Sequence, residues 1–271
     1  MTYTLTLAHL YASHMNVYGD RGNVIALAQR CAGRGIALTV TPVEPGDTVA
    51  WASFDMAFFG GGQDSGQTLI ARDLLERQGA GLRAAIEDGL VLLAICGGYQ
   101  LLGHYFLTHT SERLPGLGVL DIHTLGGKQR LIGNCVVEAA LGAGQGDWGI
   151  GGQGDGAFAL SPRPLVPPSL VQLVGFENHS GRTYHGPGVR SLGKVLVGHG
   201  DNGEDGLGGA VYKNTWGCYL HGSLLPKNPQ LTDHLIGLAL ARRYGAAATL
   251  TPLEATLELR AQRAMVERLT H

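Results

Sequence analysis

The chain has few of the residues that identify disulfide-rich, metal-binding or membrane proteins. Its 271 residues include four cysteines and no CxxC pair: Cys31, Cys96, Cys135 and Cys218. This sparse set excludes a disulfide-stapled fold, predicts no metal site, and favours a reducing cytoplasm. No apolar run is long enough to span a bilayer. The first residues also lack the basic region and cleavage site of a signal peptide.

Charge and phosphate-binding patterns are scarce as well. The net charge is −2 and the isoelectric point is near 6.6, which argues against a nucleic-acid-binding surface. No Walker-type glycine loop is present, so ATP binding by that motif is excluded. What the chain does have is 44% hydrophobic residues, enough for the core of one large domain over residues 1–271.

Strand-like and helix-like segments alternate along the first hundred residues. This alternation predicts a parallel sheet with helices on both faces, followed after residue 116 by mixed or antiparallel strands. Strands are expected at residues 4–10, 36–41, 55–59, 90–95, 117–120, 131–137, 170–176, 195–197, 209–212 and 216–220, and helices at 20–30, 67–78, 81–87, 228–243 and 254–269. A glycine-rich stretch at about 141–156 is predicted to be a surface insertion.

One segment joins a buried strand to a reactive side chain. The apolar run from Leu90 to Ile95 suits a buried parallel strand, and Cys96 follows it directly, ahead of two glycines. The next apolar residues have the spacing of a helix face: Leu101, Leu102, Tyr105 and Phe106. Cys96 is therefore predicted to lie at a strand-to-helix corner, where a nucleophile is exposed and a helix N-terminus favours the thiolate. The alternative is a buried core cysteine.

A candidate base lies far downstream. The segment from Thr215 to Leu220 is typical of a strand, and His221 follows it. A cysteine nucleophile needs a base that is near in space but often distant in sequence. Because the ends of neighbouring strands lie side by side, His221 is predicted to reach the nucleophile. His179, in a polar stretch, is the rival base.

Several blocks together resemble a known family. Residues 94–100 and 219–222 resemble the class I, triad-type glutamine amidotransferases, in their cobyric acid synthase-like branch. Further blocks resemble the glutamine amidotransferase subunits of lipid II isoglutaminyl synthases, at residues 16–23, 60–64, 130–134, 175–183 and 221–229. The resemblance covers the chain from about Tyr3 to about Tyr244.

The resemblance implies a fold and an activity. The fold would be a three-layer α/β arrangement with a mostly parallel central sheet, flanking helices and added antiparallel strands. The chain would hydrolyse L-glutamine to glutamate and ammonia through a cysteine thioester. A Mur ligase-like synthetase subunit would form a heterodimer with it, bind ATP and magnesium, and amidate D-glutamate of lipid II to D-isoglutamine. Work at the inner face of the cytoplasmic membrane, without insertion and without a cofactor in this chain, follows from this picture.

Roles for single residues follow from the chemistry and the resemblance. Cys96 would be the nucleophile, and His221 would hold the proton and pass it to departing ammonia. Backbone N–H groups of Gly97 and Gly61 would form the oxyanion hole. Two further residues would touch the substrate, Arg130 at the glutamine α-carboxylate and Gln100 one turn after the nucleophile.

The chain departs from the wider class at one position. Most triad amidotransferases place a carboxylate two residues after the histidine, and here Ser223 stands there. A histidine without its orienting acid loses tautomer control and stabilisation of the imidazolium. We therefore predict that the partner subunit supplies the acid, with Glu177 as the alternative inside the chain.

Two other functions compete with this interpretation. The chain could serve an amidotransferase for a cobyrinate-like acid, with the same glutaminase chemistry and a different synthetase. It could also be a catalytically silent binding subunit that kept the fold. The presence of Cys96, His221 and Arg130 argues against the silent subunit.

Overall fold

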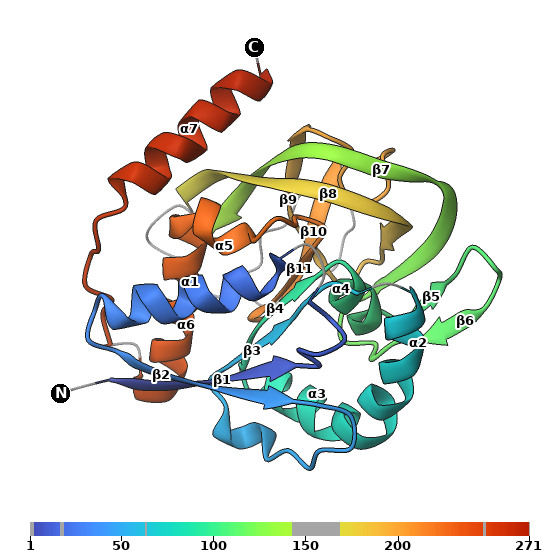
Figure 1. Ribbon diagram of the computed structural model, residues 1–271, viewed down its shortest axis with the longest axis horizontal. Helices are drawn as coiled ribbons and strands as arrows, with labels where there is room; N and C mark the ends of the chain where they lie inside the picture. Colours follow the sequence, from blue (N-terminus) through green and yellow to red (C-terminus); the bar gives the residue numbers. More distant parts are fainter. Residues whose placement is uncertain (1–2, 17–18, 63, 143–168, 246–247, 271) are drawn as a thin grey trace, which may run out of the picture.

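An eleven-stranded sheet runs through the part of the chain described by the computed structural model, which comprises residues 3–16, 19–62, 64–142, 169–245 and 248–270. The strand order is β2-β1-β3-β4-β11-β10-β9-β7-β5-β6, and β8 pairs with β7 (Figure 1). The strands are β1 (Thr4–Leu10), β2 (Ala37–Val43), β3 (Met56–Phe59), β4 (Val91–Ile95), β5 (Tyr105–Leu107), β6 (Arg113–Pro115), β7 (Ile122–Leu141), β8 (Ser169–His185), β9 (Arg190–Val197), β10 (Leu207–Tyr212) and β11 (Thr215–Cys218).

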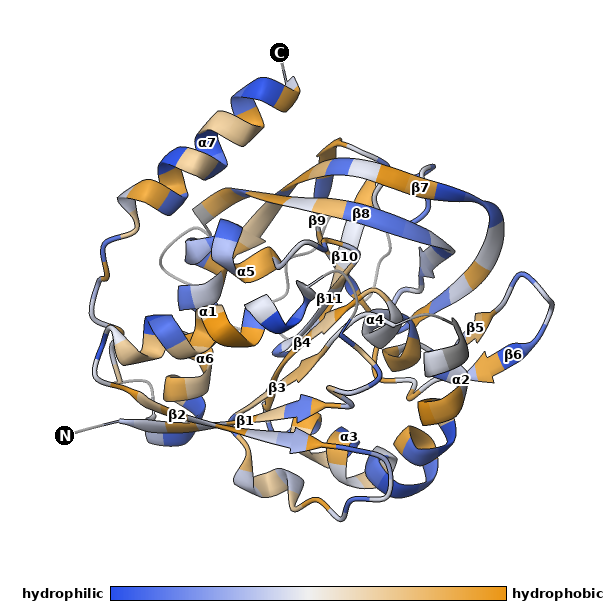
Figure 2. Ribbon diagram, in the orientation of Figure 1, coloured by the Kyte–Doolittle hydropathy of each residue, from blue (hydrophilic) through white to orange (hydrophobic). Residues whose placement is uncertain are grey.

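The parallel part of the sheet forms the core. Strands β2, β1, β3, β4 and β11 are parallel neighbours. Every residue of β3 and β4 is buried, as expected for strands covered on both faces, and Figure 2 shows their apolar character. Because these strands run in the same direction, their carboxyl ends meet at one edge, where loops can bring reactive groups together.

Helices cover both faces of this parallel core. Figure 1 shows α1 and α6 on one face and α2 and α3 on the other. The helical segments are α1 (Arg21–Ala32), η2 (Trp51–Ser53), α2 (Asp64–Asp73), the π-helical turn η3 (Leu74–Gln78), α3 (Gly79–Glu87), α4 (Gly97–Leu102), α5 (Leu224–Lys227), α6 (Pro229–Tyr244) and α7 (Thr256–Thr270). The predicted three-layer α/β class is confirmed.

The rest of the sheet is largely antiparallel. Strand β10 pairs antiparallel with β11 and with β9, and β7 pairs antiparallel with β9 and β8. The β7–β8 ladder is long and contains a register shift between Gly126 and Leu131. This shift bends the hairpin, so that its middle crosses the region above the carboxyl ends of the parallel strands (Figure 1).

Several local predictions differ from the structure. The helix after Cys96 ends at Leu102, and Tyr105–Leu107 forms β5 instead of a further helical turn. The residues at 117–120 form no strand, whereas 113–115 do. Short apolar runs suit helix and strand equally, so spacing alone could not decide these two segments.

In the second half of the chain, the sequence predicted a glycine-rich insertion and a last helix. The glycine-rich insertion at 141–156 lies mostly outside the described residues, which resume at Ser169. The last helix is α7, Thr256–Thr270, close to the range read from the sequence. No helix in the described ranges is long and apolar enough to cross a bilayer.

Candidate active site

Cys96 occupies a strained corner between β4 and α4. Its backbone has φ +49° and ψ −104°, a left-handed φ that non-glycine residues seldom adopt. Its amide donates to the Cys218 carbonyl at 2.9 Å, and its carbonyl accepts from the Gln100 amide at 2.9 Å. The corner is thus held from both sides, as a nucleophile elbow requires. Cys96 is the most accessible of the four cysteines, at 8% exposure.

The glycines after Cys96 allow close packing on the turn at residues 60–62. The Gly98 amide donates to the Gly60 carbonyl at 3.1 Å. A Cβ atom on Gly98 would lie 2.6 Å from the Phe59 carbonyl oxygen, which leaves no room for a side chain. The start of α4 therefore rests directly on the turn after β3, and this contact places Cys96 against Gly61.

His221 reaches Cys96 from the neighbouring strand. Strands β4 and β11 are parallel, with Cys218 opposite Ile95, so the residues after them leave the sheet at the same edge. His221 also exchanges two backbone hydrogen bonds with Phe176 of β8, at 2.8 and 3.2 Å. Its side chain is 1% exposed and lies near that of Cys96, because both border the same point beside Gly61. The structure thus brings the two predicted reactive residues together.

A carboxylate of the same chain also contacts His221. Oδ1 of Asp20 lies 3.4 Å from Nδ1 of His221, and Asp20 is fully buried. The sequence analysis predicted an acid from the partner subunit, with Glu177 as the alternative inside the chain, and did not name Asp20, which lies beside His221. Ser223 occupies the position where the wider class carries a carboxylate, which suggested that the chain has no acid near His221. Asp20 lies there nevertheless, on a loop 201 residues earlier in the sequence. The only signal in the sequence was the block at residues 16–23.

The alternative acid predicted inside the chain, Glu177, is engaged elsewhere. Its two carboxylate oxygens accept hydrogen bonds from the amides of His199 at 2.6 Å and Gly200 at 2.9 Å. Glu177 is wholly buried, and these amides satisfy its charge. Glu177 therefore fixes the turn after β9 rather than the orientation of His221.

The surroundings of His221 favour its protonated form. Burial opposes the imidazolium, but the Cys96 thiolate and the Asp20 carboxylate outweigh that effect and raise the pKa of His221 to about 10. At neutral pH His221 is therefore held as the imidazolium, with the sulfur of Cys96 nearby. Such a pair holds a nucleophile and a proton donor ready together.

Gly61 lies at the centre of the site, but its amide is already engaged. The N–H of Gly61 donates to Oδ2 of Asp20 at 2.7 Å. A Cβ atom at Gly61 would lie 2.7 Å from Cε1 of His221 and 3.3 Å from Cβ of Cys96. An oxyanion role for this amide therefore requires that the Asp20 hydrogen bond be exchanged for the substrate oxygen.

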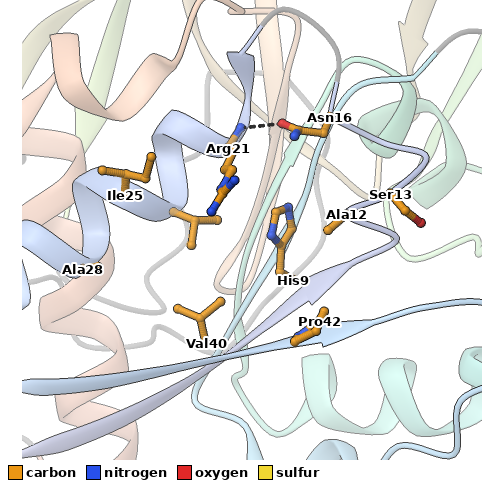
Figure 3. Close-up of a pocket in the computed structure, with 10 residues that line it drawn as sticks. His9, Ala12, Ser13, Asn16, Arg21, Ile25, Ala28, Val40 and Pro42 are labelled. Atoms are coloured by element: carbon orange, nitrogen blue, oxygen red, sulfur yellow. Dashed lines mark hydrogen bonds between the residues drawn. The ribbon is translucent and has the colours of Figure 1, made fainter.

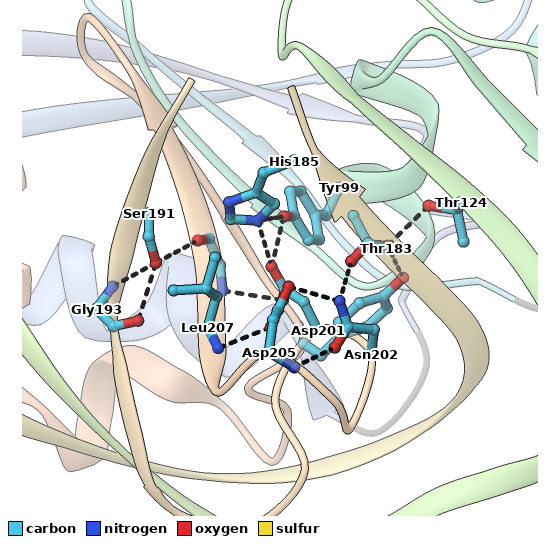
Figure 4. A network of polar contacts seen from close by, with 12 residues as sticks. Tyr99, Thr124, Thr183, His185, Ser191, Gly193, Asp201, Asn202, Asp205 and Leu207 are labelled. Atoms are coloured by element: carbon cyan, nitrogen blue, oxygen red, sulfur yellow. Dashed lines mark hydrogen bonds and ion pairs between the residues drawn. The ribbon is translucent and has the colours of Figure 1, made fainter. Parts of the chain in front are cut away.

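Gln100 is buried and committed to neighbouring side chains. Its Nε2 donates to the hydroxyl of Tyr219 at 3.0 Å, and its Oε1 accepts from Nε2 of Gln67 at 3.0 Å. The Tyr219 hydroxyl is in turn 2.6 Å from the Thr183 hydroxyl. Figure 4 shows this chain of polar contacts continuing to Thr124. In this arrangement Gln100 positions Tyr219.

The same view shows a second polar cluster behind the elbow. Tyr99 donates to Oδ2 of Asp201 at 2.9 Å, and Nε2 of His185 lies 2.7 Å from the same oxygen (Figure 4). Burial and the Asp201 charge raise the pKa of Tyr99. Asp201 also accepts from the Gly209 amide at 2.9 Å. This cluster ties α4 to β8 and β10, which supports the elbow from behind.

The rival base, His179, packs beside the site instead of against Cys96. Its ring stacks on Tyr219 with centroids 3.6 Å apart and an interplanar angle of 6°. Its Nδ1 lies 2.8 Å from the Gly181 carbonyl, and its Nε2 is 3.8 Å from Glu177. His179 thus fixes the Tyr219 ring, two residues before His221.

Arg130 lies on the long hairpin at the end of its register shift. The residue is exposed. Its guanidinium donates to the side-chain oxygen of Asn178 at 2.8 Å and to the Asn178 carbonyl at 2.9 Å. The next residue, Leu131, is the register partner of His179. Arg130 therefore lies next to the register partner of His179, and its guanidinium group binds Asn178 on the other strand of the hairpin.

A cavity of about 460 Å³ lies beside the site, between α1 and β2. Figure 3 shows His9 and Arg21 among its lining residues, and neither Cys96 nor His221 belongs to that lining. Asn16 and Arg21 both line it, and the side chain of Asn16 accepts from the Arg21 amide at 2.8 Å. Among the described residues, no cluster of metal-binding side chains is present.

A parallel α/β sheet with a strained strand-end cysteine and a histidine on the adjacent strand is the arrangement of a class I glutamine amidotransferase. The chain belongs to the CobB/CobQ-like glutamine amidotransferase domain family, whose model matches residues 6–229.

Two curated relatives match nearly the whole chain. The lipid II isoglutaminyl synthase (glutamine-hydrolyzing) subunit GatD of Staphylococcus aureus is 36% identical over 97% of this chain and 96% of its own length. The subunit of the same name from Streptococcus pneumoniae is 36% identical over 90% of this chain and 83% of its own. A cobyric acid synthase from Pelotomaculum thermopropionicum is 34% identical over 63% of this chain, but over only 30% of its own length.

Solved structures agree with the fold. PurLQS from Thermotoga maritima superposes with a TM-score of 0.52 at 15% identity, covering 89% of this chain and 98% of that one. A glutamine amidotransferase from the same organism gives a TM-score of 0.50 at 13% identity, covering 98% of both chains. At these identities the likeness establishes the class I amidotransferase fold alone.

Proposed function

We propose that this chain is the glutamine-hydrolysing subunit of a lipid II isoglutaminyl synthase. The observation that carries the proposal is the placement of the buried His221 next to Cys96 on its strained elbow, at the ends of two paired strands. Two relatives that bear this function in their names match nearly end to end. A chain that had kept only the fold would have no need to hold a cysteine in a left-handed conformation.

The reaction begins with the thiolate. Cys96 attacks the side-chain amide carbon of L-glutamine, and a tetrahedral intermediate forms with its negative charge on the former carbonyl oxygen. His221 donates its proton to the departing nitrogen, so ammonia leaves and a γ-glutamyl thioester remains on Cys96. His221 then takes a proton from water, which attacks the thioester and releases glutamate. The sulfur returns as thiolate beside the protonated histidine.

Other residues bind and stabilise the substrate in this proposal. The amide of Gly97 donates to the oxyanion, and the amide of Gly61 joins it once Oδ2 of Asp20 has released that N–H. Arg130 turns from Asn178 to grip the α-carboxylate of glutamine. Gln100 acts by holding Tyr219 at the wall of the site, and direct contact with substrate would require it to exchange a partner.

The ammonia is used by a second subunit. The chain has no Walker loop, so ATP and magnesium belong to a partner synthetase, which we take to be Mur ligase-like. That partner would activate the α-carboxylate of D-glutamate in the lipid II stem peptide, and ammonia would convert it to D-isoglutamine. Lipid II is held in the membrane, so the complex would work at the inner membrane face without insertion of this chain.

A cobyrinate-like acceptor is the second candidate. It is supported by the match to a cobyric acid synthase, but that match spans 63% of this chain and 30% of the relative. The lipid II relatives match over nearly the whole length of both chains. The coverage therefore favours lipid II as the acceptor.

The test is amidation with each acceptor. The purified complex of this chain with its partner, isolated from the native cell, is supplied with glutamine, ATP and magnesium. We expect conversion of lipid II to its D-isoglutamine form and no reaction with a cobyrinate-like acid. Amidation of the cobyrinate-like acid, with lipid II left unchanged, would replace the proposal with its alternative.

A further inference from the structure

One buried side chain beside the elbow has an unpaired oxygen. Gln67, in the first turn of α2, is 1% exposed. Its Nε2 donates to Oε1 of Gln100 at 3.0 Å, but its own Oε1 has no hydrogen-bond partner among the described residues. Most buried polar atoms in proteins are paired, because an unpaired one has lost its hydration without a replacement. The oxygen of Gln67 is therefore available for a donor that is not part of this chain.

The neighbours of Gln67 fix which end of its amide is unpaired. Its Nε2 also faces the carbonyl oxygen of Gly62, at 3.5 Å. Turning the amide over would place its oxygen against that carbonyl oxygen, which cannot donate a hydrogen bond. The side chain thus presents its nitrogen to Gly62 and Gln100, and the unpaired end is an acceptor.

Gln67 lies against the residue that follows the nucleophile. A Cβ atom added to Gly97 would lie 3.0 Å from Nε2 of Gln67 and 3.0 Å from the amide nitrogen of Gly62. Because the Gly97 amide is the expected oxyanion donor, the carboxamide of bound glutamine would be held next to this point. The NH2 group of a carboxamide is bonded to the same carbon as its oxygen. The acceptor of Gln67 is therefore close to where the substrate would present its N–H groups.

The unpaired oxygen is the open end of a chain of hydrogen bonds. Gln67 donates to Gln100, which donates to the Tyr219 hydroxyl at 3.0 Å. That hydroxyl lies 2.6 Å from the hydroxyl of Thr183. Hydrogen bonds in such a chain polarise one another, so a donor at Oε1 of Gln67 would strengthen the bonds that follow. The chain thus leads from the expected position of the carboxamide to Tyr219, two residues before His221.

We infer that Gln67 is a specificity-determining residue of the glutaminase site, and that its Oε1 accepts a hydrogen bond from the side-chain NH2 of bound L-glutamine. This inference rests on the proposed glutaminase function and deepens it. Glutamate, the product, has a carboxylate in place of that NH2 and offers only acceptors there. Two acceptors placed together repel each other, so Gln67 favours the substrate over the product.

The chain offers a matched control for Gln67. Gln78 is also 1% exposed, and both ends of its amide are paired. Its Oε1 accepts from the Trp51 indole at 3.1 Å, and its Nε2 donates to the Asp47 carbonyl at 2.9 Å. Gln78 ends η3, which follows α2 at the end opposite Gln67. Gln78→Met therefore removes an equally buried amide at a place with no reactive residue.

The first experiment measures binding without turnover. The complex of this chain with its partner, carrying Cys96→Ser, is titrated calorimetrically with L-glutamine and with L-glutamate. The same titrations are made after Gln67→Met or Gln78→Met is added, and the Kd of glutamate is divided by that of glutamine. Gln67→Met should lower this ratio by about 10- to 100-fold, because glutamine loses a buried hydrogen bond and glutamate loses none. Gln78→Met should leave the ratio unchanged.

A second substitution separates the acceptor from the shape of the side chain. In Gln67→Glu, burial and the facing oxygens of Gly62 and Gln100 favour a protonated carboxyl group. Its O–H can donate to Gln100 while its other oxygen still accepts, so the ratio of Kd values should stay near that of the parent complex. An equal loss in Gln67→Glu and Gln67→Met, or no loss in either, would overturn the inference. Thermal unfolding of each variant is followed in parallel.

The third measurement uses the complex with Cys96 intact. Gln67→Met should lower kcat/KM for glutamine by about 10- to 100-fold, while the inhibition constant of glutamate should change little. A residue that only supports the fold would weaken the binding of both ligands alike. Parallel weakening of glutamine and glutamate would therefore show that Gln67 is structural, and it would overturn the inference.

The outcomes separate this inference from the proposed function. If the preference for glutamine over glutamate depends on Gln67, but the complex does not amidate lipid II, the inference holds and the lipid II proposal fails. If lipid II is amidated while Gln67→Met keeps the parent ratio of Kd values, as Gln78→Met should, the proposed function holds and the inference is overturned.

Discussion

Cys218 of β11 and Ile95 of β4 are register partners in adjacent parallel strands. Cys96 follows Ile95 directly, and His221 follows Cys218 by three residues. Because the two strands run in the same direction, both reactive residues leave the sheet at the same edge. The pairing of two apolar strands therefore brings together a nucleophile and a base that lie far apart in the sequence.

Replacing the nucleophile should abolish glutamine hydrolysis. In Cys96→Ser the hydroxyl is ionised far less than a thiol, so we expect no measurable ammonia release and an unchanged unfolding temperature. A thiol-alkylating glutamine analogue should modify Cys96 alone. The other cysteines are at most 2% exposed, and burial raises the pKa of Cys31 to about 11 and that of Cys218 to about 12. Retained activity in Cys96→Ser, with label on another cysteine, would refute the assignment.

Removing the arginine of the long hairpin should weaken glutamine binding. Arg130→Ala is expected to raise the glutamine KM by about 10- to 100-fold, the effect of losing a hydrogen bond to a charged group, with a smaller change in kcat. Arg182→Ala is the control, because Arg182 lies on the same hairpin and binds the carbonyls of Ser180 and Gln129. Steady-state kinetics give the glutamine KM of both variants. Equal KM values would exclude Arg130 from substrate binding.

A methyl group at the turn after β3 should disturb the reactive pair. In Gly61→Ala the added Cβ would lie 2.7 Å from Cε1 of His221, so the imidazole must move. We expect kcat to fall by about 10-fold or more, because a displacement near 1 Å costs that much or more in such sites. Gly237→Ala on α6 has open space around it and should keep full activity while gaining about 1 kcal/mol of stability. Normal turnover by Gly61→Ala would show that this close contact is not needed.

Stability should fall in mild acid because of His234. Burial lowers the pKa of this histidine to about 4, below the value of about 6.5 expected in the unfolded chain. The unfolded state therefore binds a proton first as the pH drops, and stability is lost between about pH 6.5 and about pH 4.

The size of this effect can be measured by urea unfolding. The ring of Trp216 lies 5.2 Å from that of His234, so tryptophan fluorescence reports on the region. His234 should contribute a loss of about 2 kcal/mol between pH 7 and about pH 5, and His234→Asn should show a shallower dependence. Identical pH dependence in the two proteins would contradict the assignment.

Much of the fold was predictable from local sequence. The first strand, Thr4–Leu10, was predicted at its observed bounds, and α6 begins at Pro229, as a proline at the first helical position indicates. The side chain of Asn228, just before that helix, does not cap it and donates to the carbonyls of Val174 and Leu224. That role depends on β8 and α5, which local sequence around Asn228 does not reveal.

The site was predictable only in part, because some of its contacts join residues that are far apart in the sequence. Cys96 and His221 could be paired because each follows a strand with a clear apolar pattern. The position of Asp20 beside His221 could not be predicted, because it depends on a loop folding back over a distance of 201 residues. The serine at position 223 was read as a missing acid, whereas its hydroxyl binds the Gly19 carbonyl beside that loop. A single sequence shows which residue occupies a position, and it does not show which distant residue folds against it.

The central claim is that nitrogen passes from glutamine, through chemistry at Cys96, to lipid II. The most direct measurement supplies amide-¹⁵N glutamine and unlabelled ammonium to the complex of this chain with its partner, and follows the isotope in lipid II by mass spectrometry. Wild type should place ¹⁵N in the D-isoglutamine amide. The Cys96→Ser complex should incorporate only unlabelled nitrogen, because free ammonium bypasses the thioester. Transfer of ¹⁵N from glutamine by Cys96→Ser would contradict the account.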